Sequence, residues 1–258
     1  MKDIQSERDK RNVFLNKVGI RDLRFPVEIR NRDGGVQGTI ANVSLSVSLR
    51  ETERGTHMSR FLENMNECGI ITPEDTKDFL FKMAENLKSE SAYLSMEFPF
   101  FIEKKAPVSG MPSRLDVDCS INSCVQNGRF DYELETKVPV TTLCPCSKEI
   151  SEYGAHNQRA MVTVKIRAEK RIWIEELIET VENCASSEIY SLLKRPDEKY
   201  VTEKAYENPK FVEDLGRDLY VKFNNDERIK AFQIDVESME SIHNHSAFAS
   251  AEKGEKTL

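Results

Sequence analysis

Hydrophobic and polar residues alternate along several segments of this chain, which is the pattern of half-buried β-strands. The clearest case is residues 40–49, where Val and Leu alternate with Asn and Ser. Residues 23–29 are expected to pair with this strand, and Asn127-Gly128 is a strong signal for a two-residue hairpin turn. The same reasoning predicts further strands at residues 93–102, 115–125, 130–140, 161–166 and 229–236, and a short one around Ala247.

A second pattern, with apolar residues three or four positions apart, predicts helices. It covers residues 57–68, a helix that opens at Thr72, residues 174–193, and a helix that follows Asn208-Pro209. Thr72 is a good N-cap because its hydroxyl can accept a hydrogen bond from a backbone N–H in the first turn. Strands in adjacent pairs, separated by helix pairs, indicate an α+β fold with antiparallel sheets covered by helices on one face.

Composition and charge limit the classes of partner. Of the 258 residues, 39% are apolar and 31% are charged, which is an ordinary balance for a soluble protein. No apolar run approaches the roughly 20 residues of a membrane helix, and the polar N-terminus lacks a secretory signal. We therefore expect a cytoplasmic protein without a membrane partner. The net charge of −7 argues against nucleic-acid binding but allows a small anionic substrate.

Glycine-rich phosphate loops are missing from the sequence. Neither GxGxxG nor GxxxxGKS/T occurs, so a Rossmann or P-loop mechanism is disfavoured. The chemistry is therefore expected from thiols, imidazoles and carboxylates.

The six cysteines are expected to be thiols, because disulfides are rare in the cytoplasm. Four stand alone in apolar or helical segments and are expected to act as small buried hydrophobic residues: Cys68, Cys119, Cys124 and Cys184. Cys144 and Cys146 differ, because only a proline separates them and His156 follows shortly after. Thiolate and imidazole are preferred zinc ligands, but this spacing is not that of a zinc finger. The residues alone support a metal site and a turn with two half-buried thiols about equally.

Two further clusters could contribute to a site. The charged run 194–209 is interpreted either as a solvated loop or as a carboxylate ligand beside cations that bind phosphate. Near the C-terminus, a strand would place His243 and His245 on one face and Glu240 on the other, and the alternative is an exposed polar strand end. A catalytic metal with three protein ligands would lower the pKa of its bound water to about 7 and supply hydroxide.

Several long motifs resemble the GTP cyclohydrolase type IB family. They are GTHMSRF at 55–61, FPFF at 98–101, KAPVSG at 105–110, LCPCSKEI at 143–150, YGAHNQ at 153–158, the run 193–214 that begins LKRPDEKY, and ESIHNHSA at 240–247. The resemblance extends from about residue 12 to about residue 250. Motifs of this length rarely match by chance.

The resemblance implies the tunnelling fold, in which paired antiparallel strands and paired helices assemble into barrels across subunits. Under this interpretation residues 1–20 form an N-terminal arm, residues 21–126 a first unit, and residues 127–258 a second unit that carries most site residues. It also implies a homo-oligomer, commonly a tetramer, with sites at the subunit interfaces.

The implied reaction converts GTP and water to 7,8-dihydroneopterin triphosphate and formate, the first step of tetrahydrofolate biosynthesis. The resemblance assigns one divalent metal per site, Zn, Mn or Fe, to Cys144, His156, Glu198 and His243, and adds His245 as a catalytic residue that could transfer protons. Substrate contacts are expected from Glu213 and Glu240 at the guanine edge, and from the following basic residues at the triphosphate: Lys148, Arg159, Lys194, Arg195 and Lys199. The role of Cys146 stays open.

Three alternatives to this function remain. One is a cyclohydrolase that yields a cyclic phosphate product, and another is a non-catalytic module of the same fold that binds a purine or pterin. The third is a structural zinc protein in which Cys144 and Cys146 hold the fold together. Product mass, formate release and the folding of a Cys144→Ala variant separate them.

Overall fold

The structure is a computed structural model that describes residue 5 and residues 7–254. Within these residues the chain forms two compact units. The first contains the residues up to Phe98 together with Ser120–Leu134, and the second contains Pro99–Cys119 together with the described residues from 135 onward. Three long strands contribute to both units: β4 (Ser91–Lys105), β5 (Pro112–Gln126) and β6 (Arg129–Leu143).

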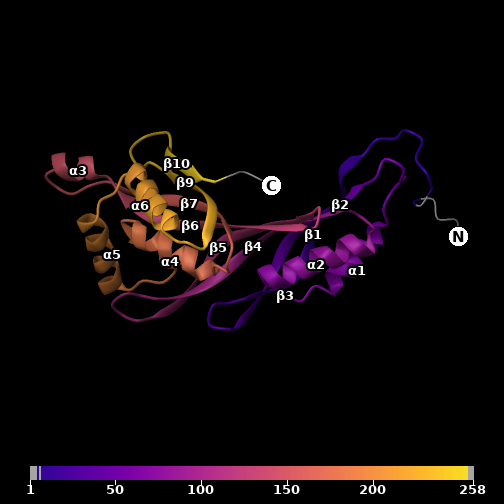
Figure 1. Ribbon diagram of the computed structural model, residues 1–258. Coiled ribbons are helices and arrows are strands. Elements are labelled where there is room, and N and C mark those ends of the chain that lie inside the picture. Colours follow the sequence, from indigo (N-terminus) through magenta and orange to yellow (C-terminus); the bar gives the residue numbers. More distant parts are fainter. Residues whose placement is uncertain (1–4, 6, 255–258) are drawn as a thin grey trace. The chain divides into compact units, whose positions relative to one another are not determined.

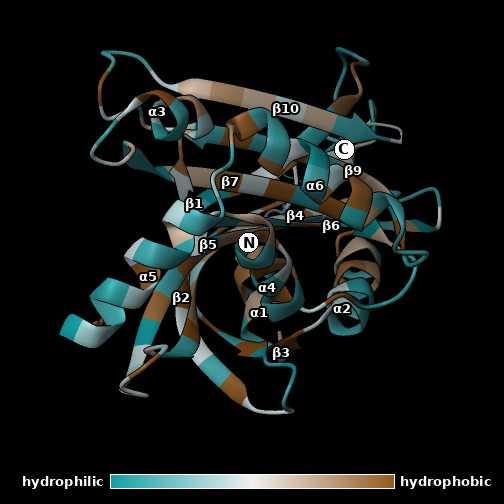
Figure 2. Cartoon of the chain, turned by 90° about the vertical axis from the view of Figure 1, so that its left-hand side faces the viewer, coloured by the Kyte–Doolittle hydropathy of each residue, from teal (hydrophilic) through white to brown (hydrophobic). Residues whose placement is uncertain are grey.

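The first unit is built around a long antiparallel pair, β1 (Leu15–Arg30) and β2 (Val36–Leu49). This confirms the predicted pairing, but β1 begins at Leu15, inside the segment expected to be an N-terminal arm. The strand extends beyond the residues with the hydrophobic pattern because pairing with β2 satisfies its backbone N–H and C=O groups. From Ala41 onward every second side chain of β2 is buried, as the alternation predicts. Figure 2 shows the change between hydrophobic and hydrophilic residues along this strand.

Two helices of the first unit, α1 (Met58–Asn66) and α2 (Pro73–Asn86), pack against each other (Figure 1). The short strand β3 (Ile70–Ile71) joins them and pairs with β1. The Thr72 hydroxyl accepts a hydrogen bond from the Asp75 N–H at 3.1 Å, which confirms Thr72 as the N-cap of α2. The buried faces of these helices carry large apolar side chains, among them Phe61, Met65, Leu80 and Met83.

The second unit contains further elements with these bounds: β7 (Asn157–Ala168), α4 (Ile174–Cys184), α6 (Val212–Asn224), β9 (Ile229–Ser238) and β10 (Ala247–Lys253). Its sheet has the strand order β10-β9-β7-β6-β5-β4, in which β9 pairs antiparallel with both β7 and β10. Helices α4 and α6 pack together in this unit, and the ring of Phe223 on α6 contacts Phe232 on β9 (Figure 1). The predicted α+β fold with antiparallel strands is confirmed.

The turn between β5 and β6 confirms the predicted hairpin. Asn127 and Gly128 have φ angles of 51° and 73°, and a type I′ turn needs positive φ at both central positions. The boundary expected between the two tandem units, at residues 126 and 127, falls at this turn and stays a prediction.

The helix predicted for residues 174–193 ends at Cys184. The next residues form a short strand, β8 (Ser187–Glu188), that pairs with β6. The Ser186 N–H donates to the Thr141 carbonyl at 3.1 Å, so backbone pairing with a distant strand overrides the helical spacing of the apolar residues.

The charged run that could be a solvated loop is a helix, α5 (Arg195–Glu207). The Asp197 carboxylate caps it by accepting a hydrogen bond from the Lys194 N–H at 2.9 Å. No helix among the described residues is both long and apolar enough to cross a membrane.

The cysteines are free thiols. Cys119, Cys124 and Cys184 are buried, as predicted, whereas Cys68 is half-buried. Burial raises the pKa of the Cys119 thiol well above its usual range and that of Cys68 to about 11. Burial also raises the pKa of the Cys184 thiol, so Cys68, Cys119 and Cys184 are protonated and poorly reactive near neutral pH.

Candidate functional site

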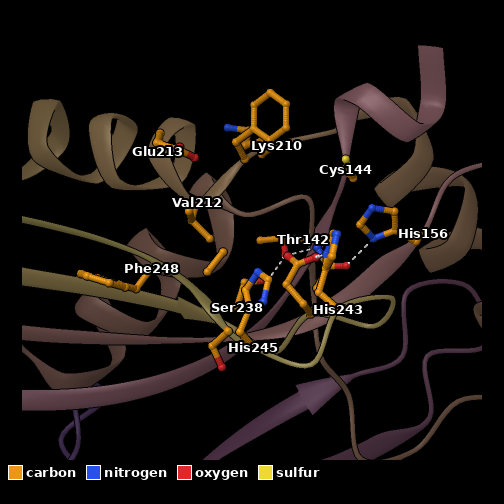
Figure 3. A pocket seen from close by; sticks show the side chains of 15 residues that line it. Thr142, Cys144, His156, Lys210, Val212, Glu213, Ser238, His243, His245 and Phe248 are labelled. Atoms are coloured by element: carbon orange, nitrogen blue, oxygen red, sulfur yellow. Dashed lines mark hydrogen bonds and ion pairs between the residues drawn. The ribbon is translucent and has the colours of Figure 1, made fainter. Parts of the chain in front are cut away.

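A pocket of about 520 Å³ opens in the second unit, where four segments meet. These segments are the end of β6, the start of β7, the start of α6 and the loop between β9 and β10 (Figure 3). Segments far apart in the sequence thus bring thiol, imidazole and carboxylate groups together. Six residues predicted for the site line the pocket: Cys144, His156, Glu213, Glu240, His243 and His245.

Cys144 follows β6 directly and is the N-cap of the short helix α3 (Pro145–Ile150). Pro145 suits the first helical position because its ring fixes φ and it has no N–H to satisfy. The Cys144 sulfur accepts a hydrogen bond from the Ser147 N–H at 3.4 Å. Local structure therefore holds this thiol at the pocket, whereas Cys146 is exposed and lies outside the lining residues.

Ser147 connects Cys144 to His156. Its hydroxyl donates to the Cys144 carbonyl at 3.1 Å and accepts from the His156 N–H at 3.2 Å. The Ser147 side chain therefore bridges the backbones of the two residues that were first expected to form the site.

Polar side chains orient the His156 ring. Its Nδ1 lies 2.9 Å from Gln158 Oε1, and Gln158 Nε2 donates to the Thr142 hydroxyl at 3.3 Å. Thr142 in turn shares a hydrogen bond of 3.2 Å with Ser238. Because an amide oxygen only accepts, this contact favours the neutral tautomer with its proton on Nδ1, in which Nε2 keeps its lone pair. That lone pair is available to a metal ion or a proton.

The loop of residues 239–246 carries the C-terminal cluster. Glu240 Oε2 lies 3.2 Å from His243 Nδ1, and the His243 and His245 rings stack with centroids 5.1 Å apart. The strand assumed here, with Glu240 on the face opposite the histidines, is wrong because an irregular loop lets the carboxylate fold onto the imidazole. The Glu240 side chain is 13% exposed and that of His243 is 53% exposed, so the histidine is open to a ligand.

The start of α6 forms another wall of the pocket and includes Lys210, Phe211 and Glu213. The Lys210 N–H donates to the Leu143 carbonyl at 3.0 Å, which ties this wall to the end of β6. The Asp214 carboxylate accepts from the Phe211 N–H at 3.1 Å and caps the helix. The positive end of the helix dipole stabilises negative charge, so the Glu213 carboxylate suits its position.

The other predicted residues lie outside the lining of this pocket. Glu198 is exposed on α5, where Lys199 pairs with Glu203 at 3.3 Å. Lys148 donates to the Tyr206 carbonyl and lies 4.4 Å from the centre of the Tyr206 ring. The pocket of one chain therefore lacks Glu198 and all five basic residues predicted for the triphosphate, and their roles stay predictions: Lys148, Arg159, Lys194, Arg195 and Lys199.

Asp197, the neighbour of Glu198, is fully buried. Its carboxylate accepts hydrogen bonds from the Val108 N–H and the Ser109 N–H at 2.8 Å each, and from the Ser109 hydroxyl at 2.6 Å. Burial acts to raise the Asp197 pKa, but hydrogen bonds from Ser109, Lys194 and Val108 outweigh it and hold the pKa well below its usual range. Asp197 thus anchors α5 to the loop between β4 and β5.

The donor chemistry of the pocket suits a metal ion. Cys144, His156, His243 and Glu240 offer sulfur, nitrogen and oxygen, a mixture that accommodates Zn²⁺, Mn²⁺ or Fe²⁺. The bond from His156 to Gln158 is the kind of outer contact that orients metal-binding histidines. Within residues 7–254, however, no three such side chains are close enough to hold one ion. The donors fit in kind, and a complete shell needs a rearrangement or a further ligand.

Sequence reasoning missed several pocket residues, among them Thr142, Gln158, Lys210, Ser238 and Phe248. Gln158 stands two positions after His156, so strand periodicity places both on one face and could have identified it. The others have no comparable local signal. They meet only because β6, β7 and β9 pair in the sheet and the start of α6 lies beside them.

A family model described as Type I GTP cyclohydrolase folE2 matches residues 1–249. The chain belongs to this GTP cyclohydrolase family. A GTP cyclohydrolase FolE2 of Thermotoga sp. (strain RQ2) is 50% identical over 258 residues, which cover 100% of this chain and 99% of the relative. FolE2 proteins of Caldicellulosiruptor bescii and Dictyoglomus turgidum are also 50% identical, over 96% and 98% of this chain and 97% and 98% of their own length. The resemblance drawn from the motifs is confirmed at the level of the FolE2 family.

Solved structures with the same fold include urate oxidases. Uricase from Arthrobacter globiformis has a TM-score of 0.54 at 9% identity, over 94% of each chain. A highly active mutant of Bacillus sp. TB-90 urate oxidase has a TM-score of 0.50 at 8% identity, over 93% of this chain and 100% of its own. The likeness concerns the fold alone, and it confirms the tunnelling fold for this FolE2 protein.

Proposed function

We propose that this FolE2 protein converts GTP and water to 7,8-dihydroneopterin triphosphate and formate, the first step of tetrahydrofolate biosynthesis. Its family membership over the whole chain makes it a GTP cyclohydrolase. The observation that carries the proposal is that one pocket unites Cys144, His156 and Glu213. These groups suit hydrolysis at one end of a guanine base and recognition at the other.

Glu213 is proposed to hold the guanine. A carboxylate can accept two parallel hydrogen bonds, one from N1–H and one from the exocyclic amine. C8, where hydrolysis begins, lies at the opposite end of the bicyclic base and would then face Cys144 and His156. Glu240, the other expected anchor, bonds His243 in this structure and so also orients a histidine.

Cys144, His156 and His243 are proposed to hold one divalent ion, Zn, Mn or Fe, after a rearrangement that brings their donor atoms together. When bound, such an ion polarises a water molecule for addition to C8. His156 presents Nε2 for this purpose because Gln158 holds Nδ1. His245, which stacks on His243, is proposed to accept and return protons while the imidazole ring opens and formate leaves.

Glu198 is proposed to reach the metal site from a neighbouring subunit of a homo-oligomer. It is exposed and lies outside the pocket of its own chain, yet the family resemblance places it at the metal. We therefore infer a homo-oligomer, a tetramer by family resemblance, in which Glu198 of the partner subunit completes the ligand set. The same interface would bring basic residues to the triphosphate: Lys148, Arg159, Lys194, Arg195 and Lys199. The substrate and the folate pathway point to a cytoplasmic enzyme.

The test incubates metal-stripped protein with GTP and one metal at a time, and follows pterin fluorescence and formate. At least one of Zn²⁺, Mn²⁺ or Fe²⁺ should restore a product with the mass of dihydroneopterin triphosphate. A product with the mass of a cyclic phosphate would correct the reaction, and GTP binding without formate would indicate a non-catalytic module. Failure of every metal to restore a pterin refutes the proposal.

A matched pair of cysteine variants tests the site. Cys144→Ala should stay folded and oligomeric but lose turnover and metal, because the thiol lines the pocket without packing in the core. Cys146→Ala, two positions away and outside the pocket, is the control for a general effect on α3. Unfolding of Cys144→Ala would instead indicate a structural metal.

A further inference from the structure

Lys210 is the one lysine or arginine among the described residues that line the pocket. It stands between the end of β6, to which its N–H is bonded, and Glu213 in the first turn of α6. Its side chain is only 17% exposed. A cation so far removed from solvent, in a pocket for a purine nucleotide, points to a contact with that nucleotide.

The Lys210 ammonium group can donate more hydrogen bonds than the one to Asp218. Its Nζ bonds one carboxylate oxygen of Asp218, a residue of α6 whose side chain is half-exposed. An ammonium group carries three N–H donors, so this contact leaves capacity for a ligand. The ion pair restrains the Lys210 side chain and holds its ammonium group beside α6.

The layout of the pocket decides which part of GTP the ammonium can reach. Figure 3 shows Lys210 and Glu213 at the start of α6, and Cys144 and His156 on the other side of the view. A guanine whose N1–H and amine face Glu213 presents O6 next to them, on the same edge of the ring. The ribose is attached at N9, beside C8, so the triphosphate extends from the end of the base that lies near Cys144 and His156.

We propose that Lys210 donates a hydrogen bond to O6 of the guanine and, with Glu213, reads its Watson–Crick edge. This inference rests on the proposed function and names the specificity of the same site. Asp218 acts as a positioning residue for the ammonium. Adenine would present an amine to Lys210 and an unprotonated ring nitrogen to Glu213, which leaves both protein groups without partners, and such a mismatch discriminates strongly.

The experiment measures dissociation constants of the purified full-length protein for guanosine, GMP and 6-thioguanosine, in which a weakly accepting sulfur replaces O6. The variants are Lys210→Met, Lys210→Arg and Asp218→Asn. Lys222→Met is the matched control, because Lys222 is an exposed lysine of α6 outside the pocket. Thermal unfolding of each variant establishes that it is folded.

Lys210→Met should lower the affinity for guanosine and for GMP by the same factor, roughly 10- to 100-fold for the loss of a charge-assisted hydrogen bond. The affinity for 6-thioguanosine should fall far less. Lys210→Arg, which keeps the donors, should retain most of the affinity, and Asp218→Asn should lose part of the preference for guanosine over 6-thioguanosine. If Lys210→Met does not fold, the comparison of Lys210→Arg with Lys210→Gln replaces it, and the loss of charge should cost affinity for guanosine.

Three results would overturn the assignment of Lys210. If Lys210→Met loses affinity for GMP but not for guanosine, the ammonium contacts the phosphate. If it loses equal affinity for guanosine and 6-thioguanosine, Lys210 supports the pocket wall without contacting O6. Unchanged binding by Lys210→Met, with normal turnover of GTP by the unmodified protein, refutes Lys210 alone. An unmodified protein that neither binds guanosine nor forms a pterin refutes the proposed function as well.

Discussion

The backbone N–H of Cys144 donates to the carbonyl oxygen of His156 at 3.1 Å. The thiol and the imidazole of the candidate site therefore start from adjacent backbone positions, although helix α3 separates them in the sequence. This contact closes a loop whose base belongs to the paired strands β6 and β7. A site built on strand ends is held more rigidly than one on a free loop, which suits groups that must stay aligned.

Ser147 should matter for turnover although it lies outside the pocket lining. Ser147→Ala removes the hydroxyl that bonds the backbones of both Cys144 and His156, so the thiol and the imidazole are held less firmly in line, although the direct backbone bond between the two residues remains. We expect kcat to fall by about 10- to 100-fold, with a smaller change in KM, as measured in a pterin fluorescence assay. Ser151→Ala, at the exposed end of the same helix, is the control, and an equal loss there would argue against a specific role for Ser147.

Gln158 should control the protonated nitrogen of His156. Gln158→Leu removes the acceptor at Nδ1, so the ring can rotate and present the wrong nitrogen. Metal affinity or activity should fall by about 10- to 100-fold, the usual cost of losing such an outer contact. Gln158→Glu keeps an acceptor and should be closer to the unmodified protein when metal content and kcat are measured. If both variants behave alike, the orientation of His156 does not depend on this bond.

The two histidines of the loop 239–246 should be needed for chemistry and not for folding. Both are exposed, so His243→Ala and His245→Ala should leave the melting temperature almost unchanged. Loss of the proton-transfer group in His245→Ala should reduce kcat by about 10²- to 10⁴-fold, and His243→Ala should lose bound metal together with turnover. Asn244→Ala, between them and outside the pocket lining, should retain activity. Near-normal turnover in both histidine variants would exclude them from the catalytic steps.

Asp197 should make stability depend on pH in the acid range. Its pKa is lower in the folded protein than its ordinary value of about 4, so its contribution is complete above that value and is lost as the pH falls below it. The melting temperature of Asp197→Asn should therefore be lower at neutral pH and should fall less on acidification. Asp116→Asn, at an exposed position of β5, should follow the unmodified protein. Parallel pH curves for the unmodified protein and Asp197→Asn would contradict this prediction.

A buried ion pair between Lys104 and Glu182 should contribute to the stability of the second unit. Their side chains are 8% and 10% exposed, and Lys104 also donates to the Ile189 carbonyl at 2.9 Å. Burial raises the pKa of Glu182 and Lys104 opposes the shift, so Lys104→Met leaves a buried carboxylate without its partner. We expect the free energy of unfolding in urea to fall by about 3–5 kcal/mol, and the double variant with Glu182→Leu to recover part of it. No recovery in the double variant would mean that lost packing, not the charge, causes the effect.

The amino-acid sequence by itself determined the features that depend on near neighbours. Alternating residues predicted the strand at 40–49, and Asn127-Gly128 predicted a turn that only residues tolerant of positive φ can form. The Thr72 cap and the Cys144 and His156 motif could also be recognised, because each lies within a short stretch. The length of the motifs identified the family before any geometry was known.

Only the tertiary structure decided which of two neighbouring residues is buried and which residues line the pocket. Asp197 and Glu198 are adjacent acids, yet one is buried by bonds to a distant loop and the other is exposed on α5. Pairing with β6 ended the predicted helix at Cys184, and the start of α6 brought Lys210 rather than the expected bases to the pocket. These outcomes depend on contacts between segments far apart in the chain, because a buried polar group or an unpaired strand edge must find its partner wherever the fold places it.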